Sequence, residues 1–220
     1  MKRSVAMKTL VSLLLVSFAA WPQVAADANK GYTTKEGREN VARTLDNPNR
    51  DKTQKPEEII AALHLRRGAT VADIGTGTGY MLPHLSRAVG PQGKVFGEDI
   101  QNDFLDKARA RAASDKLTNT ELFLGDENDP KLPAASVDVA LVLDVYHHFD
   151  YPDKMLANIA HSLKQTGRLV IIDYYKKNMP GHIRLERDDV IKEIEAAGFK
   201  LVSKVDSIGA NQYMLTFARP

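Results

Sequence analysis

The chain has 220 residues and a formal charge of +2, and 43% of its residues are hydrophobic and 26% are charged. These values exclude a wholly disordered or collagen-like chain. The sequence has no Cys, which excludes disulfides, thiolate zinc sites and a cysteine nucleophile. The small net charge gives no indication of a nucleic-acid partner.

The first residues predict a secretory signal peptide. Lys2, Arg3 and Lys8 precede an apolar run from Leu10 to Ala20, and small residues then follow as far as Ala26. This three-part pattern is typical of a leader that is removed on export. The apolar run is shorter than the roughly 20 residues that a membrane span needs. We therefore expect cleavage near Ala26 and a periplasmic or secreted protein with no stable membrane span; a membrane tether formed by an uncleaved N-terminal segment is the alternative.

Residues 27–54 predict an N-terminal arm, with a helical pattern over 35–45 and a polar loop after it. Residues 55–220 predict one domain in which helices and strands alternate. The expected strands are 69–75, 93–99, 119–126, 136–144, 166–174, 200–208 and 212–219, and the expected helices are 56–67, 79–90, 102–114, 151–164 and 188–199. This order predicts a doubly wound α/β fold with a mostly parallel, seven-stranded sheet. The last two strands have no helix between them, so we expect an antiparallel hairpin.

The sequence VADIGTGTGY provides the strongest local motif. A strand ends at Asp73 and Ile74, and glycines then alternate with threonines before Tyr80. Such glycines suit a tight turn that a ligand approaches closely. A dinucleotide fingerprint would need Gly at position 80, and a phosphate-binding P-loop would need a G-K-[ST] ending, which is absent. A glycine-rich turn that binds no ligand also stays open.

Acidic residues follow the next two expected strands. Glu98 and Asp99 end the second strand, about 20 residues after the glycine loop, where an acid that binds ribose is expected. A carboxylate can accept hydrogen bonds from both ribose hydroxyls. The third strand ends in Gly125, Asp126 and Glu127.

Together, and in this order, these motifs resemble those of the class I S-adenosylmethionine-dependent methyltransferases over about residues 56–219. The resemblance implies a Rossmann-like fold, S-adenosylmethionine as the cofactor, and Asp73 as the partner of its cationic amino-acid part. It assigns Asp99 to the ribose hydroxyls, and Asp126 and the Glu127 backbone to the adenine. The implied cofactor-binding residues are Asp73, Gly75, Thr76, Gly77, Gly79, Tyr80, Asp99, Ile100, Asp126, Glu127 and Asp144.

The resemblance also implies methyl transfer to a small-molecule acceptor, which can be a thiol, a hydroxyl or an amine. Candidates for the chemistry follow the fourth expected strand: Asp144, Tyr146, His147, His148 and Asp150. We prefer His147 as the base or acceptor-orienting group, because the ordinary pKa of His, near 6.5, suits proton transfer at neutral pH. Asp144 is the second catalytic candidate. A packing role for the histidine pair stays open.

The acceptor site and its surroundings carry further expectations. The segment after the fourth strand lacks the Asn/Asp-Pro-Pro-aromatic motif of amino-group nucleic-acid methyltransferases, so we expect no nucleic-acid partner. Residues 49–51 and the loop 174–177 are candidate walls of the acceptor site, and solvated loops are the alternative. We expect no metal. Asp144 and Asp173 could imitate the divalent-ion set of some small-molecule O-methyltransferases, but Tyr174 stands where Asn would be. Adjacent His147 and His148 should diverge unless a loop redirects them.

Two other functional classes remain open. The first is a catalytically silent module of the same fold that binds the cofactor or a metabolite. The second is a nicotinamide-dependent oxidoreductase, which would bind a dinucleotide at the same sheet edge. The sequence specifies neither the acceptor nor the oligomeric state.

Overall fold

The computed structural model describes residues 23–220. Most of the predicted signal peptide, residues 1–22, therefore lies outside the described residues. Within the described part, no helix combines the length and the hydropathy that crossing a membrane would require.

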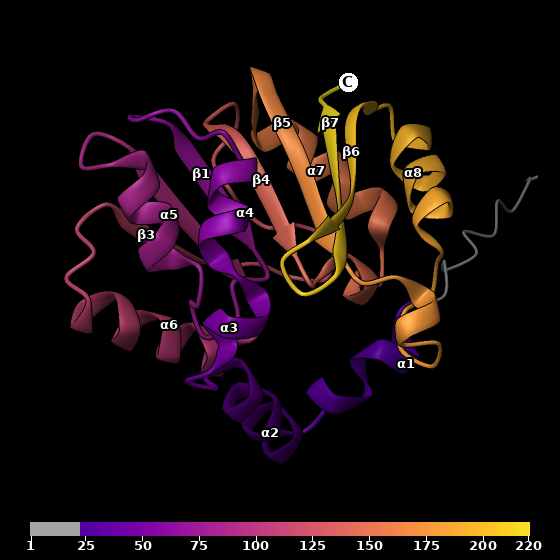
Figure 1. The fold of residues 1–220 in the computed structure, drawn as a ribbon, viewed down its shortest axis with the longest axis horizontal. Coiled ribbons are helices and arrows are strands. Elements are labelled where there is room, and N and C mark those ends of the chain that lie inside the picture. The colour runs from indigo at the N-terminus through magenta and orange to yellow at the C-terminus, as the bar shows by residue number, and fades with distance from the viewer. Residues whose placement is uncertain (1–22) are drawn as a thin grey trace, which may run out of the picture.

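The fold is built on one seven-stranded sheet in the order β3-β2-β1-β4-β5-β7-β6 (Figure 1). The strands are β1 (Thr70–Ile74), β2 (Lys94–Asp99), β3 (Thr120–Leu124), β4 (Val137–Leu143), β5 (Leu163–Asp173), β6 (Lys200–Ile208) and β7 (Gln212–Ala218). The first five run parallel, whereas β7 lies between β5 and β6 and is antiparallel to both. The predicted fold class and the C-terminal hairpin are both confirmed.

Helices cover both faces of the sheet (Figure 1). The helices α4 (Pro56–Ala62), α5 (Leu82–Val89) and α6 (Asn102–Ser114) pack on one face, and α7 (Pro152–Ser162) and α8 (Arg187–Ala196) pack on the other. In β4, Val139, Leu141 and Leu143 join the first core, and Ala140 and Val142 join the second. Because alternate side chains of a strand point to opposite faces, a strand covered on both sides is apolar throughout.

Several element boundaries differ from the sequence prediction, among them the end of the helix expected over 56–67, which ends at Ala62. The helix expected from residue 79 begins at Leu82, because positive φ angles at Gly77 and Gly79 keep the preceding segment in turns. The strand expected from residue 166 begins at Leu163, directly after α7 ends at Ser162.

The N-terminal arm lies beyond the carboxyl ends of the parallel strands. It contains α1 (Ala26–Asn29), α2 (Lys35–Leu45) and α3 (Arg50–Gln54), which run along the lower edge of the molecule in Figure 1. Side-chain contacts fasten it to the domain, among them Arg38 to Asp103, Thr78 to Asp46 and Tyr80 to Asp51, each at 2.7 Å. The arm therefore closes over the sheet edge at which the glycine loop lies.

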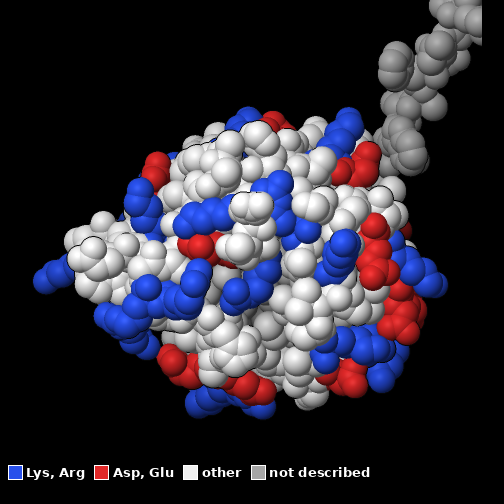
Figure 2. Space-filling view, turned by 90° about the horizontal axis from the view of Figure 1, so that it is seen from above, with Lys and Arg blue, Asp and Glu red and all other residues white. Residues whose placement is uncertain are grey.

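The opposite edge of the sheet has a distinct charge pattern. Figure 2 shows Lys and Arg gathered across the middle of this face, with most Asp and Glu toward its margins. A net charge near zero therefore conceals a local excess of positive charge, so the absence of a nucleic-acid partner stays a prediction.

Candidate functional site

A cavity of about 520 Å³ lies between the carboxyl edge of the sheet and the arm. Ligand pockets commonly have volumes of about 300–1,000 Å³. The sheet side contributes Gly75, Thr76, Gly77, Glu98, Asp99, Ile100 and Asp144, and the arm contributes Asn29, Tyr32, Arg38, Leu45 and Arg50. The arm thus forms one wall of the cavity.

The glycine loop needs glycine for two reasons. Gly75, Gly77 and Gly79 all have positive φ, at 70°, 57° and 80°. A Cβ on Gly75 would lie 2.5 Å from the Val145 side chain, so this glycine is required by the packing of the chain itself. A Cβ on Gly77 would meet the Leu45 side chain of the arm at 3.0 Å, and both residues line the cavity. Gly77 is therefore the position at which a ligand can approach the backbone closely.

Asp99 fastens the glycine loop to the end of β2. Its Oδ2 accepts the Gly77 N–H at 2.9 Å, and its Oδ1 accepts the Gln101 N–H at 2.8 Å. Burial raises the pKa of Asp99 to about 6, against the lowering effect of these backbone N–H groups. Each carboxylate oxygen retains a second lone pair that can accept a ligand hydroxyl.

Asp73 and Glu98 are buried acids on either side of this loop. Asp73 lies outside the set of cavity-lining residues, and its Oδ2 accepts the Thr76 hydroxyl at 2.6 Å. Burial raises the pKa of Asp73 to about 6, while the Thr76 hydroxyl and Arg50 act in the opposite direction. Glu98 does line the cavity, and its Oε1 has no hydrogen-bond partner among the described residues. Burial, and then Asp99, raise the pKa of Glu98 well above its ordinary value.

Asp144 follows β4 with a φ of 59°. Its carboxylate accepts a hydrogen bond from Gln212, whose own side-chain oxygen accepts from Gln54 of the arm at 2.8 Å. Burial raises the pKa of Asp144 well above its ordinary value, Asp173 raises it further, and Arg50 lowers it. Burial therefore favours the protonated form of this carboxyl over the ionised form.

Arg50 is the basic residue placed among these acids. Its guanidinium lies 4.0 Å from the centre of the Tyr80 ring, and its Nη1 donates to the Leu45 carbonyl at 3.2 Å. Residues 49–51 were expected to form a wall of the acceptor site, and of these Arg50 lines the cavity.

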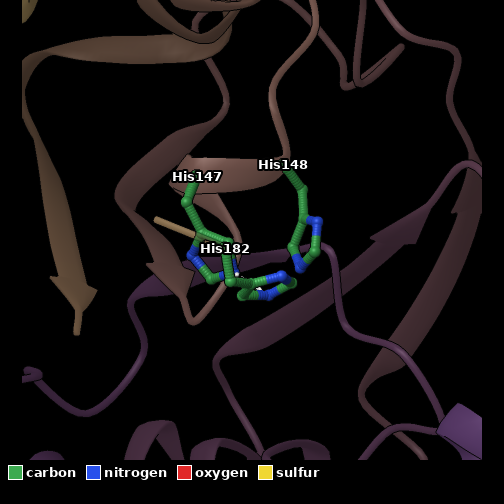
Figure 3. A group of neighbouring side chains, drawn as sticks. All are labelled: His147, His148 and His182. Atoms are coloured by element: carbon green, nitrogen blue, oxygen red, sulfur yellow. Dashed lines mark hydrogen bonds between the residues drawn. The ribbon is translucent and has the colours of Figure 1, made fainter. Parts of the chain in front are cut away.

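The histidine pair is arranged differently from the expectation. The His147 Nδ1 lies 2.7 Å from an Asp173 carboxylate oxygen, and its Nε2 lies 3.2 Å from the His182 Nε2 (Figure 3). The side chains of His147 and His148 do not diverge here, because their ring centres are 4.1 Å apart. Hydrogen-bond partners from two other elements hold the rings in this arrangement: Asp173 in β5 and Asn29 in α1.

His148, rather than His147, lines the main cavity. His147 lies behind it, beside a smaller hollow that it shares with Asp173 and Tyr146. The catalytic role of His147 stays a prediction, and the structure gives His148 the more direct access to a ligand.

Other predicted site residues fall both inside and outside the cavity. Ile100 and Glu127 line it. The Asp126 carboxylate instead accepts the N–H groups of Asn128 and Asp129 in its own loop, at 2.9 and 3.0 Å, and pairs with Lys131 at 3.1 Å. The lining residues also leave out Gly79, Tyr80, Asp126 and the loop 174–177. The ligand roles of these residues stay predictions.

Several cavity residues were missed from the sequence. Asn29, Tyr32, Phe104 and Met155 line the cavity. Arg38 lines it too and pairs with Asp103. No local motif marks these residues, since each reaches the site through the packing of α1, α2, α6 or α7.

The comparisons with known proteins agree with this geometry. A family model described as a methyltransferase domain matches residues 65–218. The crystal structure of an S-adenosylmethionine-dependent methyltransferase from Aquifex aeolicus is 30% identical, with a TM-score of 0.76, over 81% of this chain and 96% of that one. The chain belongs to the S-adenosylmethionine-dependent methyltransferases.

Two curated relatives match this chain over only part of their own length. A ubiquinone/menaquinone biosynthesis C-methyltransferase from Vibrio campbellii is 28% identical over 66% of this chain and 54% of its own length. An uncharacterized 37.1 kDa protein in a Streptomyces fradiae transposon is 34% identical over 51% of this chain and 32% of its own length. The chain thus spans from a third to about half of the length of these relatives.

The residues present fit the cofactor of the family. S-adenosylmethionine, which family membership supports as the cofactor, has ribose hydroxyls that donate hydrogen bonds. The Asp99 oxygens retain lone pairs for them, and Glu98 also lines the cavity. The glycine backbone at Gly77 and the cavity volume leave room for an extended ligand.

Proposed function

We propose that the protein binds S-adenosylmethionine in this cavity and transfers its methyl group to a small-molecule acceptor. The observation that carries the proposal is that the glycine loop, Asp99 and Asp144 line the same cavity, which the arm covers. When bound, the cofactor supplies a sulfonium-activated methyl group.

The residues of the chain then have three tasks in this proposal. Asp99 and the backbone at Gly77 hold the cofactor. The hydrogen bond between them fixes the glycine loop in place before the cofactor binds. The arm excludes water, and this strengthens electrostatic interactions in the cavity. The walls of the cavity also align the reactants. Asp144 is the group in the wall that exchanges a proton with an acceptor oxygen, sulfur or nitrogen in this proposal.

The chemical class of the acceptor is inferred from the other residues that line the cavity. They include aromatic Tyr32 and Phe104 and basic Arg38 and Arg50. Such a surface suits a flat, anionic or phenolic molecule. One curated relative is named for a reaction in quinone biosynthesis, so phenols and quinols belong in the acceptor panel beside thiols and amines.

The test is a turnover assay of the purified protein with S-adenosylmethionine and that panel. Formation of methylated product together with S-adenosylhomocysteine supports the proposal. Tight binding of the cofactor in calorimetry without turnover of any acceptor would favour the catalytically silent module. Binding of a nicotinamide dinucleotide that Asp99→Ala weakens would favour the oxidoreductase.

We also propose that the protein is exported and acts outside the cytosol. The sequence pattern of residues 1–26 supports this proposal, and cell fractionation with mass spectrometry of the N-terminus tests it. The methyl-transfer proposal also includes the expectation that the acceptor is a small molecule and that the protein has no nucleic-acid partner. A gel-shift assay that detects DNA or RNA binding at physiological salt would refute the latter.

A further inference from the structure

Three of the six histidines in the chain meet at one point. His147 and His148 come from the turn Tyr146–His148 after β4, and His182 comes from the loop before α8. One nitrogen from each ring lies within 4.8 Å of the other two. Figure 3 shows the three rings turned toward one another rather than toward solvent.

Hydrogen bonds fix which nitrogen of His147 faces the cluster. Its Nδ1 lies 2.7 and 2.9 Å from the two oxygens of Asp173, a fully buried carboxylate that can only accept when ionised. The proton therefore sits on Nδ1, and the lone pair of Nε2 points at the His182 Nε2, 3.2 Å away. A carboxylate behind the imidazole is the usual partner of a histidine that binds a metal.

A similar argument applies to His148. The Asn29 side-chain nitrogen donates to the Asp150 carboxylate at 3.0 Å and to the His148 carbonyl at 3.1 Å, which fixes the orientation of the amide. The Asn29 oxygen must then accept, so the His148 Nδ1, 2.8 Å away, is the donor. Its Nε2 then carries a lone pair, towards which the Tyr32 hydroxyl can donate at 3.5 Å.

We propose that His147, His148 and His182 bind one divalent transition-metal ion, with zinc preferred, through their Nε2 atoms. Imidazole ligands suit zinc, copper and nickel. Two nitrogens bound at about 2.0–2.1 Å to one tetrahedral zinc lie about 3.3 Å apart, close to the 3.2 Å between His147 and His182. The third ring, that of His148, must close in by a small movement, because the three ligand atoms lie within 4.8 Å of one another.

The surroundings suit an ion with one open coordination position. Three protein ligands plus a water or substrate is the arrangement of catalytic zinc sites. His148 lines the main cavity, so the open position faces it. The proposal does not depend on methyl transfer, because metal binding is measured directly.

The experiment measures metal binding to the full chain after treatment with a chelator. Zinc affinity is measured by competition with a chromophoric chelator, and cobalt is added to record the visible absorption of a tetrahedral site. We expect one equivalent of metal, and at least tenfold weaker binding for His148→Ala and for His182→Ala. The exposed His161 on α7 provides the matched control, and His161→Ala should bind like the parent protein. Asp173→Asn should weaken zinc binding by about 10–100-fold, as loss of such a carboxylate commonly does.

Three outcomes would overturn the proposal. The first is that the parent protein binds no zinc, in which case the 3.2 Å contact is a hydrogen bond between two imidazoles. The second is that His182→Ala and His161→Ala bind zinc equally. The third is a cobalt spectrum typical of octahedral coordination by water. Thermal unfolding of each variant confirms that it is folded, and the two alanine variants at half-buried positions give independent readings.

Discussion

Replacing Asp99 by Asn should separate ligand binding from folding. The carboxylate accepts two backbone N–H groups, at 2.9 Å from Gly77 and 2.8 Å from Gln101. In the proposed complex it also accepts the ribose hydroxyls. An amide provides one acceptor oxygen, so at least one bond to a ligand hydroxyl is lost. A hydrogen bond to a charged group contributes about 1.5–3 kcal/mol, so the cofactor affinity should fall by about 10- to 150-fold.

The same change should leave the free energy of unfolding nearly unchanged. Burial raises the pKa of Asp99 to about 6 from its ordinary value of 3.8. At 1.36 kcal/mol for each pKa unit, ionising this carboxyl at pH 7 costs the folded state about 3 kcal/mol. Asn removes that cost, but it loses one bond to a backbone N–H group, which costs about 1–3 kcal/mol. The two effects nearly cancel.

The assay is calorimetric titration with S-adenosylmethionine and S-adenosylhomocysteine, combined with thermal unfolding. Asp106→Asn is the matched control, since Asp106 is an exposed acid on the neighbouring helix α6. It should change neither quantity. An affinity change of less than threefold for Asp99→Asn would refute the ribose assignment. A fall in melting temperature parallel to the fall in affinity would show that the carboxylate acts mainly on the fold.

Three further results are expected. Gly75→Ala places a Cβ 2.5 Å from Val145 at a φ of 70° and should lower the melting temperature by about 5–10 °C, whereas Gly181→Ala, which meets no described atom within 4 Å, should leave it unchanged. Burial raises the pKa values of Asp73 and Asp99 to about 6, above the ordinary 3.8. Their contribution to stability is therefore fully present below pH 4 and is lost as the pH rises through 6. Cofactor affinity should rise over the same range, and an affinity that stays constant between pH 5 and 7 in calorimetry would contradict this. Tyr80→Phe removes the 2.7 Å hydrogen bond to Asp51 and should cost about 1 kcal/mol in urea unfolding, and equal stability would show that the arm does not depend on it.

The succession of strands and helices along the chain was predictable because local sequence patterns mark each element. The run from Val137 to Leu143 is almost entirely apolar, as a strand covered on both faces must be. The glycine loop was predictable for a similar reason, since a turn with positive φ at Gly75, Gly77 and Gly79 is open to glycine and to few other residues. The boundaries were less accurate, because the same glycines delay the start of α5 to Leu82.

The arrangement of the site beyond the sheet edge was not predictable in this way. Arg38 reaches Asp103, and Asn29 reaches His148, through contacts between segments far apart in the sequence. No periodicity or motif encodes such contacts. The arrangement of the two histidines has the same origin: neighbouring side chains were expected to diverge unless a loop redirected them, and Asp173 and Asn29 each fix one ring.

The position of the predicted cleavage site gives a last prediction. Cleavage after Ala26 would remove Ala25, which is buried and whose N–H donates to the Asp150 carboxylate at 3.2 Å. Val24 also donates to the Asp150 carbonyl at 3.3 Å. Asn29 would still bind the other carboxylate oxygen at 3.0 Å, so the site would be weakened rather than lost.

Two forms of the chain, beginning at Gln23 and at Asp27, test this argument. Loss of a hydrogen bond to a buried carboxylate costs about 1–3 kcal/mol, and in a protein of this size each kcal/mol lowers the melting temperature by about 2–4 °C. The shorter form should therefore melt about 2–12 °C lower and bind the cofactor more weakly, because Gln23 and Ala26 line the cavity. Equal melting temperatures and affinities would mean that residues 23–26 are dispensable, and cleavage at Ala26 would then be compatible with a complete site. A large loss would instead predict that an exported form retains these residues, which the mass of its N-terminal peptide would reveal.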